Sequence, residues 1–475
     1  FLHHHVTKPP NPLPHWIDSV MERLDINGDD TGNKNAEARL ATLKQRVSTI
    51  CVDIAALPEN ANAVYEGFAK DLEESFECSD DGSLQSVRLA NKRLGALPES
   101  FGDLVISRNL ELQGNSLSTL PEAFGTLDIG GNLDLSEGNA FTSFPESIAQ
   151  LKVGGNLNLS KAVGLICWNE PPVEGTDKFR TVPCAFPPNF GAIRIGGDLD
   201  MYGATLPTPL PDCFGQLRPG GSLVLTACNQ WTTPEGLGLL PESFCRLEVG
   251  GDLKLSSNHM TSLPAGFSNI KVGLRDGAGS GCLYLDKNGL ETLPDSFGEL
   301  GALRYLNLSY NSFTSLPESF GKLEVAFACD ISHCSIRGDG KTPDPSLVLP
   351  TSFCSLKVGG GLVMEDTKLQ ALPATFGQLK VGGSLSLELA TAEAFECVDD
   401  LGSLSVGDKL TIMAHEVKDM PNAIGNVACK EICIDLHPET DLDAGKAVFS
   451  DAVWQEPNAK VWGGNICAHF EVKRK

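Results

Sequence analysis

One short phrase recurs along most of this chain, and it restricts the possible folds more than any other feature. It reads Leu-Pro-Glu-Ser-Phe or a close variant and begins at Leu97, Leu120, Leu240, Leu293 and Leu316. Looser copies place the same slot at residues 144, 186, 210, 263, 349, 372 and 420, with a degenerate copy at 397. Several neighbouring copies lie 23 residues apart, as Leu97 and Leu120 do. Such a period is typical of a solenoid, in which each repeat is one coil stacked on the next.

The sequence between two phrases carries leucines at fixed spacing, followed by an asparagine. In one copy Leu253 and Leu255 frame a single strand residue, and Asn258 follows three positions later. Residues 84 to 436 therefore resemble leucine-rich-repeat proteins. The resemblance implies an α/β fold, a right-handed leucine-rich-repeat solenoid with a parallel sheet on its concave face and short helical turns on its convex face.

Most copies depart from the family pattern in one slot. Where the family has a leucine three residues before the strand, they carry two glycines, as at Gly154-Gly155, whereas the copy at 300 to 311 keeps Leu303. We therefore expect the glycines to occupy a core-facing slot and to let neighbouring backbones approach closely. The preceding valine, such as Val153, then fills the remaining space.

The asparagine slot is expected to satisfy backbone groups of the loop that follows each strand. It is occupied by Asn115, Asn258, Asn288 and Asn311. Cys228 and Cys334 replace asparagine in two copies, a substitution that the family tolerates. These two thiols are expected to be structural rather than reactive.

The two ends of the chain do not match the repeat. Residues 1 to 83 combine an extended arm, up to Pro14, with helical spacing of apolar residues over 15–24, 35–54 and 62–76. We expect an α-helical cap here, because the open edge of a solenoid needs cover. Residues 437 to 475 are expected to cap the other end.

Irregular spacing between phrases indicates inserted loops at about 161 to 185, 229 to 239 and 335 to 348. All three follow a predicted strand, so they emerge at the same edge of the solenoid, where loops often provide specificity. Candidate partner-binding residues on this insert edge are Trp168, Phe179, Arg180 and Trp231. Cys167 and Cys184 flank the first loop, but their proximity in sequence does not establish a disulfide.

Residues at the centre and the margins of each predicted strand point onto the concave face. Candidate partner-binding residues there are Glu111, Asp134, Asn158, Asp198, Asp200, Tyr202, Lys254, Tyr284, Tyr305, Asn307 and Asp330. Acidic and amide side chains with interspersed tyrosines favour a basic protein segment as the partner, with tyrosine as anchor. The alternative is that these side chains only provide a soluble surface.

Charge and hydropathy exclude several classes of partner. The net charge of −24 opposes contact with a phosphate backbone, so we expect no nucleic-acid partner. No apolar run approaches the ~18 residues of a membrane-spanning helix, although peripheral attachment to a membrane complex stays open. The chain begins at Phe1 and carries 15 cysteines, an odd number. A signal or transit segment removed before Phe1 would explain this start, as would trimming of the chain, and the compartment is not determined.

A weak calcium-loop pattern lies near the N-terminus. Asp25, Asn27 and Asp29 match the first, third and fifth ligand positions of an EF-hand. Asp30 replaces the glycine of the sixth position and Ala36 the glutamate of the twelfth, which favours a plain acidic turn. The histidines at 3 to 5 lie on an arm without a supporting shell, so adventitious metal binding is the better interpretation.

No motif for catalysis or cofactor binding is found in the sequence. It lacks a Gly-x-Ser-x-Gly elbow, a phosphate loop and a His-Glu-x-x-His helix, and we expect no cofactor. Asn158-Leu-Ser160 and Asn307-Leu-Ser309 match the glycosylation sequon, but each lies in a predicted strand, which favours chance.

The prediction is a non-enzymatic protein-binding or scaffold protein, such as an accessory structural subunit of a larger complex. The resemblance implies this because leucine-rich-repeat proteins commonly recognise other proteins. The first alternative is an extracellular recognition or adhesion module for peptide or glycan ligands. Calcium control through the N-terminal helices is a third hypothesis, and an enzyme comes last.

Overall fold

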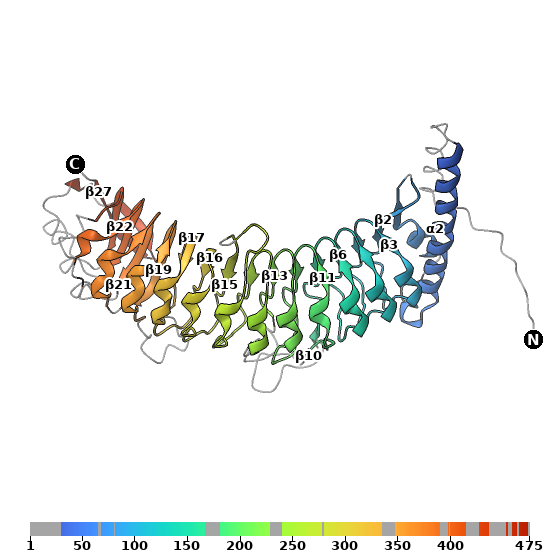
Figure 1. The fold of residues 1–475 in the computed structure, drawn as a ribbon, viewed down its shortest axis with the longest axis horizontal. Helices are drawn as coiled ribbons and strands as arrows, with labels where there is room; N and C mark the ends of the chain where they lie inside the picture. Colours follow the sequence, from blue (N-terminus) through green and yellow to red (C-terminus); the bar gives the residue numbers. More distant parts are fainter. Residues whose placement is uncertain are drawn as a thin grey trace, which may run out of the picture. The chain divides into compact units, whose positions relative to one another are not determined.

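A computed structural model describes residues 30–64, 68–79, 81–166, 181–228, 240–277, 280–334, 347–369, 371–389, 398, 400–414, 427–436, 453–454, 458–462 and 465–473. The chain divides into two compact units. The first comprises Phe1–Leu165 and Pro183–Leu199, and the second comprises Ile166–Val182 and Asp200–Lys475. Short strands line one side of each unit and single helical turns line the other (Figure 1).

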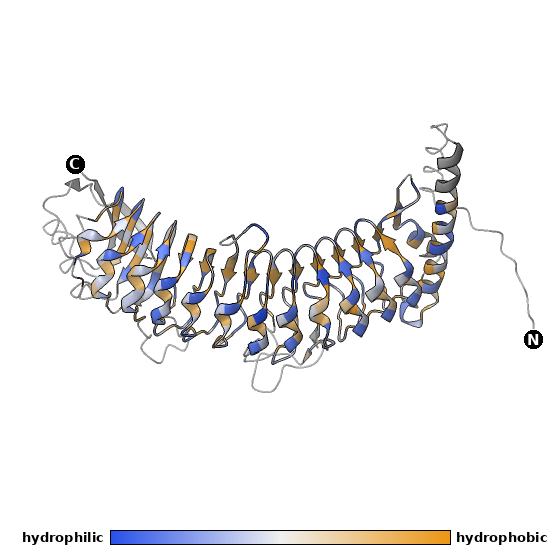
Figure 2. Ribbon diagram, viewed as in Figure 1, coloured by the Kyte–Doolittle hydropathy of each residue, from blue (hydrophilic) through white to orange (hydrophobic). Residues whose placement is uncertain are grey.

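The first unit begins with a long amphipathic helix, α2 (Asp30–Ala56). Leu40, Val47, Ile50 and Ile54 recur at helical spacing and are all buried, which explains why this segment is a helix with one apolar face (Figure 2). The expected N-terminal helix is thereby confirmed.

The helix predicted over residues 62–76 is only partly formed. The chain makes a turn of 3₁₀ helix, η1 (Pro58–Asn60), and the short helix α3 (Phe68–Glu73). It then enters the strand β1 (Phe76–Cys78), which pairs antiparallel with β2 (Leu84–Arg88). Phe76 is fully buried in that strand. The helical prediction for the end of this segment was wrong. A buried aromatic residue at this point fits the spacing of a helix and that of a strand equally well, and the pairing with β2 makes the segment a strand.

Parallel strands of the first unit carry the Leu-x-Leu pattern. The first apolar residues of the pattern are in register, with Val87 opposite Leu110, Leu110 opposite Leu133 and Leu133 opposite Leu157. After β2 come β4 (Leu110–Glu111), β6 (Leu133–Asp134), β8 (Leu157–Asn158) and β12 (Leu199–Asp200), within which the division between units falls. A smaller parallel sheet contains β3 (Val105–Ile106), β5 (Asp128–Ile129), β7 (Lys152–Val153) and β11 (Arg194–Ile195).

The second unit repeats the arrangement with longer strands. Its parallel strands are β13 (Leu223–Val224), β14 (Leu253–Lys254), β15 (Cys282–Tyr284), β16 (Leu303–Asn307), β17 (Glu324–Asp330), β19 (Gly361–Leu369), β21 (Leu385–Leu389), β23 (Lys409–Ala414) and β24 (Glu431–Leu436). The short strands β18 (Lys357–Val358), β20 (Lys380–Val381) and β22 (Ser405–Val406) pair beside them. A separate two-stranded sheet pairs β9 (Leu165–Ile166) with β10 (Thr181–Val182). The expected solenoid is thus confirmed in each unit.

The recurring phrase forms a turn of 3₁₀ helix, as expected. In the copy that begins at Leu97, Pro98 before the turn is extended, and its carbonyl accepts the Phe101 N–H at 3.0 Å. These turns are η2 (Glu99–Asp103), η3 (Glu122–Thr126), η4 (Glu146–Gln150), η5 (Phe190–Ala192), η6 (Asp212–Gln216), η7 (Glu242–Arg246), η8 (Phe267–Asn269), η9 (Phe297–Glu299), η10 (Glu318–Lys322), η11 (Thr351–Ser355), η12 (Ala374–Gln378) and η14 (Leu401–Ser403).

The buried phenylalanines of successive turns stack on one another. In the second unit the rings of Phe267, Phe297, Phe320 and Phe353 follow at centroid distances of 6.2, 6.4 and 6.0 Å, nearly parallel. Each ring is fully buried. Such contacts exist only between repeats, which is why a single repeat would not fold alone.

The glutamate of the phrase has a role that its position in the sequence does not reveal. The Glu99 carboxylate accepts hydrogen bonds from the backbone N–H groups of Glu122 and Ala123, at 3.2 and 2.8 Å. The Glu318 carboxylate accepts them from Thr351 and Ser352, at 3.2 and 3.1 Å. Each carboxylate therefore caps the first N–H groups of the next 3₁₀ turn.

The Gly-Gly slot is not core-facing, contrary to the expectation. In β17, Val325 lies in register both with Leu303 and with Val358, so a valine takes the place of the family leucine. Val358 is buried, whereas Gly359 directly after it is exposed. Copies with the glycine pair have one more residue between the buried valine and the first strand leucine than the copy with Leu303 has. The two glycines form a tight bend between the short strand and the long strand.

The glycines do allow close approach between repeats. A Cβ atom added at Gly154 would lie 2.3 Å from the carbonyl oxygen of Gly130, one repeat earlier. At Gly155 it would lie 2.2 Å from Oδ1 of Asn132. Only glycine fits at such distances, because a side chain there would overlap the neighbouring coil.

The C-terminal segment adds antiparallel strands to the sheet of the second unit. They are β25 (Val453–Trp454), β26 (Asn458–Trp462) and β27 (Asn465–Lys473). β27 pairs along β24, from Ile432 opposite Val472 to Leu436 opposite Ala468. The free edge of β24 is therefore covered by the chain's own last strand.

Candidate functional site

The candidate binding residues of the first unit lie on the solvent side of its parallel strands. Glu111, Asp134 and Asn158 occupy the same position in β4, β6 and β8, between two buried leucines, and each is half-buried. Arg88 precedes them in β2 and pairs with Glu77 at 2.9 Å. The alternation of a strand explains this placement, and it brings the three predicted residues into one row.

In most of these side chains, one oxygen accepts hydrogen bonds that stabilise the local structure. Oδ1 of Asp134 accepts hydrogen bonds from the backbone N–H and hydroxyl of Ser136, at 2.9 and 2.6 Å. Asp330 binds Ser332 in the same way. In the sequon-like segments, Oδ1 of Asn158 and of Asn307 accepts from the serine N–H two residues on, at 3.0 Å. The Asn-Leu-Ser pattern therefore closes the turn after the strand.

The residues that precede the strands form a ladder between repeats. Oδ1 of Asn132 accepts the backbone N–H of Asn156, and Oδ1 of Asn156 accepts that of Asp198, both at 2.8 Å. Asp198, predicted as a binding residue, is half-buried at the end of this ladder. Its backbone is thus fixed by the repeat before it.

The second unit carries a pair of tyrosines on its strand face. The rings of Tyr284 in β15 and Tyr305 in β16 lie 5.4 Å apart between centroids and are tilted by 51°. Nζ of Lys254, at the position matching Tyr284 in β14, lies 5.8 Å from the Tyr284 ring centroid. Asn307 and Asp330 continue the row in β16 and β17. The structure brings these five predicted residues together.

Asp200 and Tyr202 begin the strand face of the second unit. Oδ1 of Asp200 accepts the Tyr202 backbone N–H at 2.8 Å, and Tyr202 is exposed. They precede β13, whose Val224 lies in register with Lys254.

Carboxylates surround the tyrosine pair. Burial raises the pKa of Tyr284 to about 12, and the nearby Cys282 and Asp252 act in the same direction. Burial also raises the pKa of Tyr305 to about 12, assisted by Asp330 and Asp286. Both hydroxyls stay protonated at neutral pH and lie in negative surroundings, which suits a cationic group of a partner.

A second group of side chains, absent from the sequence predictions, lines the edge at which strands of the second unit end. We call Lys287, Tyr310, His333 and Asp366 the strand-exit row; they follow β15, β16 and β17 or lie late in β19, and all have positive φ, from 49° to 56°. Nζ of Lys287 lies 5.7 Å from the Tyr310 ring centroid, and the Tyr310 and His333 rings stack at 4.3 Å. Each of the four lies two residues after the second apolar residue of its strand pattern, and this shared position was the sequence signal that could have identified the row.

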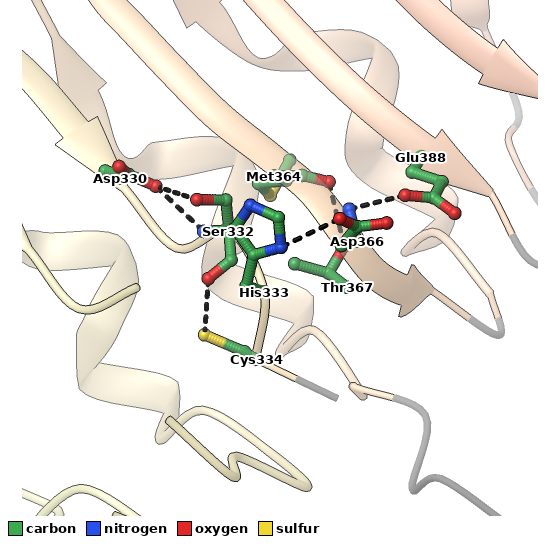
Figure 3. A network of polar contacts seen from close by, with 8 residues as sticks. All are labelled: Asp330, Ser332, His333, Cys334, Met364, Asp366, Thr367 and Glu388. Atoms are coloured by element: carbon green, nitrogen blue, oxygen red, sulfur yellow. Dashed lines mark hydrogen bonds and ion pairs between the residues drawn. The ribbon is translucent and has the colours of Figure 1, made fainter. Parts of the chain in front are cut away.

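The strand-exit row ends at a buried carboxyl group (Figure 3). Nδ1 of His333 lies 2.8 Å from Oδ2 of Asp366, and the Asp366 backbone N–H donates to Oε2 of Glu388. Glu388 is only 5% exposed. Burial, together with the Asp366 carboxylate, raises the pKa of Glu388 to about 7.

The thiols of Cys228 and Cys334 are buried and hydrogen-bonded in the asparagine slot. Burial raises the pKa of Cys228 and of Cys334 to about 12, and their sulfurs donate to the carbonyls of Met201 and Leu308, each at 3.4 Å. This fits the structural role expected for the asparagine slot. Burial raises the pKa of Cys184 to about 12 as well. Cys167 lies outside the described residues.

Among the described residues, no group of three or more His, Cys, Asp or Glu side chains could hold a metal ion. An open cavity of about 420 Å³ lies between α2 and the first strands, lined by Leu43 and Val105 among others. Another of about 670 Å³ lies beside β18, lined by Lys357 and Gly359 among others. Neither is lined by the tyrosine pair or the strand-exit row. No helix within the described ranges is long and apolar enough to cross a membrane.

Two sets of predicted residues lie outside the described part of the chain. The first set consists of the insert-edge residues Trp168, Phe179, Arg180 and Trp231. The calcium candidates Asp25, Asn27 and Asp29 are the other set. Both remain predictions.

Comparison with solved structures returns leucine-rich-repeat proteins. A leucine-rich-repeat protein of Leptospira interrogans is 18% identical, with a TM-score of 0.40, over 81% of this chain and 97% of that one. The ectodomain of the Arabidopsis thaliana receptor kinase GASSHO1/SCHENGEN3, in complex with CASPARIAN STRIP INTEGRITY FACTOR 2, is 18% identical, with a TM-score of 0.38, over 82% of this chain and 47% of that one. YopM from Yersinia enterocolitica is 16% identical, with a TM-score of 0.21, over 80% and 90%.

No curated protein matches the sequence. The Leucine Rich Repeat family model matches residues 302–323, which include β16 and all of η10. The matched segment is one of the repeats whose strands, asparagines and phenylalanine turns stack in each unit. Residues 302–323 are therefore a leucine-rich repeat, and each unit has the fold of a leucine-rich-repeat solenoid.

Proposed function

We propose that this chain is a non-enzymatic binding protein whose strand face docks a protein partner with a basic surface, as a scaffold or an accessory subunit of a larger complex. Leucine-rich-repeat proteins generally mediate contacts between proteins. The tyrosine pair Tyr284–Tyr305 carries the proposal, because half-buried aromatic side chains on a rigid sheet are the usual anchors of an interface.

Charge supports a basic partner. Oδ1 of Asp252 accepts the Cys282 backbone N–H and Oδ1 of Asp286 accepts the Ser256 hydroxyl. Both carboxylates are half-buried and lie close enough to the tyrosine hydroxyls to contribute to their raised pKa, Asp252 for Tyr284 and Asp286 for Tyr305. Lys254 beside Tyr284 shows that this face accommodates an ammonium group.

The test is site-specific photo-crosslinking in native extract. A photoreactive residue at Val224, on the strand face beside Lys254, should give discrete adducts with a partner. The matched control places the same residue at Gln216, which is exposed on η6. Adducts of equal yield from both positions, or none from Val224, would contradict docking on the strand face.

Two further variants connect the adducts to the proposed anchors. Tyr284→Ala and Tyr305→Ala should each reduce the Val224 adduct by about tenfold, the loss expected for an interface anchor worth more than ~1 kcal/mol. Raising the salt concentration should weaken the adduct as well, because a basic partner is attracted through exposed charges.

A further inference from the structure

The strand β17 carries no glycines in its Gly-Gly slot. It has Ala326 and Phe327 there, whereas the next repeat has Gly359 and Gly360 at the matching positions. The preceding strand β16 has only Arg304 opposite Ala326 and Phe327, so these two residues form a β-bulge. Phe327 is 63% exposed. The bulge thus presents to solvent an aromatic ring at a position where glycine serves in the next repeat.

An open cavity of about 670 Å³ adjoins the bulge. Ala326 lines it together with Ala302 of the preceding repeat, and both alanines are exposed. The lining continues to Lys357 in β18 and to Lys380 in β20. It therefore crosses four neighbouring parallel strands, β16, β17, β18 and β20. We call this cavity, with Phe327 beside it, the cross-strand groove.

The cross-strand groove carries an excess of positive charge, although the whole chain has a net charge of −24. Glu324 is the one acidic residue among the described residues that line the cavity, and it pairs with Lys357 at 2.5 Å. Lys380 lies in register with Lys357 on one side and with Ser405 on the other. Within the described part of the chain, neither Lys380 nor Arg304 forms an ion pair. Both are exposed, so each can pair with a carboxylate of another molecule.

The sheet sets the spacing of these two cations. Arg304 in β16 and Lys380 in β20 are separated by β17 and β18, so three strand spacings put them ~14 Å apart across the sheet. An extended polypeptide rises ~3.3 Å per residue, so residues four positions apart in it span ~13 Å. Their side chains point to the same face, as does that of the residue midway between them.

We propose that the cross-strand groove binds an extended acidic segment of a partner protein, with two carboxylates four residues apart and an apolar side chain midway between them. The carboxylates pair with Arg304 and Lys380, and the apolar side chain packs against Ala326 and Phe327. Charge complementarity selects an acidic occupant, because the exposed cations on both sides of the apolar surface have no other ion-pair partner among the described residues. The tyrosine pair lies in negative surroundings and suits the opposite charge, so this inference is independent of the proposed function.

Fluorescence anisotropy on the intact chain tests the groove, with an end-capped, labelled peptide of sequence Glu-Thr-Leu-Thr-Glu as the probe. At 0.15 M salt, where the acidic remainder of the chain is screened beyond ~8 Å, the peptide should bind with a Kd below about 1 mM. The peptides Gln-Thr-Leu-Thr-Gln and Glu-Thr-Ser-Thr-Glu should each bind about fivefold more weakly, because the first lacks the charges and the second lacks the apolar side chain.

Two variants locate the binding. Lys380→Glu should weaken it about tenfold, because attraction becomes repulsion. Phe327→Gly should weaken it about fivefold, and it introduces the residue that the next repeat has in this slot. The matched control is Lys152→Glu, at the same repeat position in the first unit, where Lys152 is exposed and pairs with Asp128 at 3.0 Å. It makes the same change in net charge and should leave the Kd unchanged.

The proposal is overturned if the acidic peptide does not bind, or if Lys152→Glu weakens binding as much as Lys380→Glu does. It is also overturned if the chain forms a dimer that Lys380→Glu dissociates in size exclusion, because the occupant is then a second copy of this chain. Thermal unfolding of each variant verifies that it folds.

Discussion

Three buried backbone groups depend on the side chain of Asn258. Its Oδ1 accepts the Cys228 N–H at 2.8 Å, and its Nδ2 donates to the carbonyls of Leu225 and Leu255 at 2.7 and 2.9 Å. Asn258→Ala leaves all three without a partner and should lower the free energy of unfolding by about 3 kcal/mol. The urea midpoint measures this. Asn258→Cys should cost less, because a thiol in this slot donates to one carbonyl, as in Cys228; an equal loss would contradict the interpretation.

Gly154 should tolerate a substitution less well than its exposure to solvent suggests. Gly154→Ala places a methyl group 2.3 Å from the Gly130 carbonyl oxygen, so the two coils must separate. We expect a loss of about 2 kcal/mol in the free energy of unfolding, within the range for overpacked sites.

The matched control is Gly301→Ala. Gly301 lies in the copy that keeps the family leucine, and nothing lies within 4 Å of a Cβ atom added there. Its urea midpoint should remain within the range of a neutral surface substitution, about 0.5 kcal/mol. Similar losses at Gly154 and Gly301 would show that loss of backbone freedom, rather than contact between repeats, explains the glycines.

At the scale of the element, the phrase glutamate joins one 3₁₀ turn to the next. Hydrogen bonds from Ser352 and Thr351 hold the pKa of Glu318 below its ordinary value. A lowered pKa means that the carboxylate stabilises the fold above pH 4.5 and that this contribution is lost as the pH falls through the folded-state value. Glu318→Ala should therefore lower Tm at pH 7 but have a much smaller effect at pH 3.

The control for this cap is Glu146→Ala. Glu146 occupies the same phrase position, yet no hydrogen bond to its carboxylate is found among the described residues. Thermal unfolding at pH 7 should leave this variant unchanged. An equal drop in Tm at both sites, or a Glu318→Ala effect that persists at pH 3, would contradict the capping role.

The elements that sequence could predict are those that occur many times. The strands and 3₁₀ turns were predictable because each copy confirms the others, and a buried leucine or phenylalanine at a fixed spacing leaves one stacking solution. β1 was not predictable, because its pattern occurs once and its Phe76 also fits the spacing of a helix. The Gly-Gly slot was misassigned because counting back from the strand cannot detect the extra residue of a bend.

The candidate surfaces were predictable from the sequence to different extents. Strand alternation correctly placed Glu111 on the first unit's strand face and Tyr284 on the second unit's. It could not show that a side-chain oxygen of Asp134 and of Asn158 accepts a hydrogen bond from the turn that follows. The strand-exit row was missed because contacts such as that between His333 and Asp366 join residues far apart in sequence.

The C-terminal strand pairing leads to a prediction about solubility. β27 covers β24 along its length, and β26 pairs with β27 in turn. Removing residues 453–473 leaves the edge of β24 with unpaired N–H and carbonyl groups, which are a template for pairing with another chain. The truncated chain should therefore form larger species than the intact chain at equal concentration, as measured by light scattering after size exclusion. Identical size distributions would show that another segment covers the β24 edge.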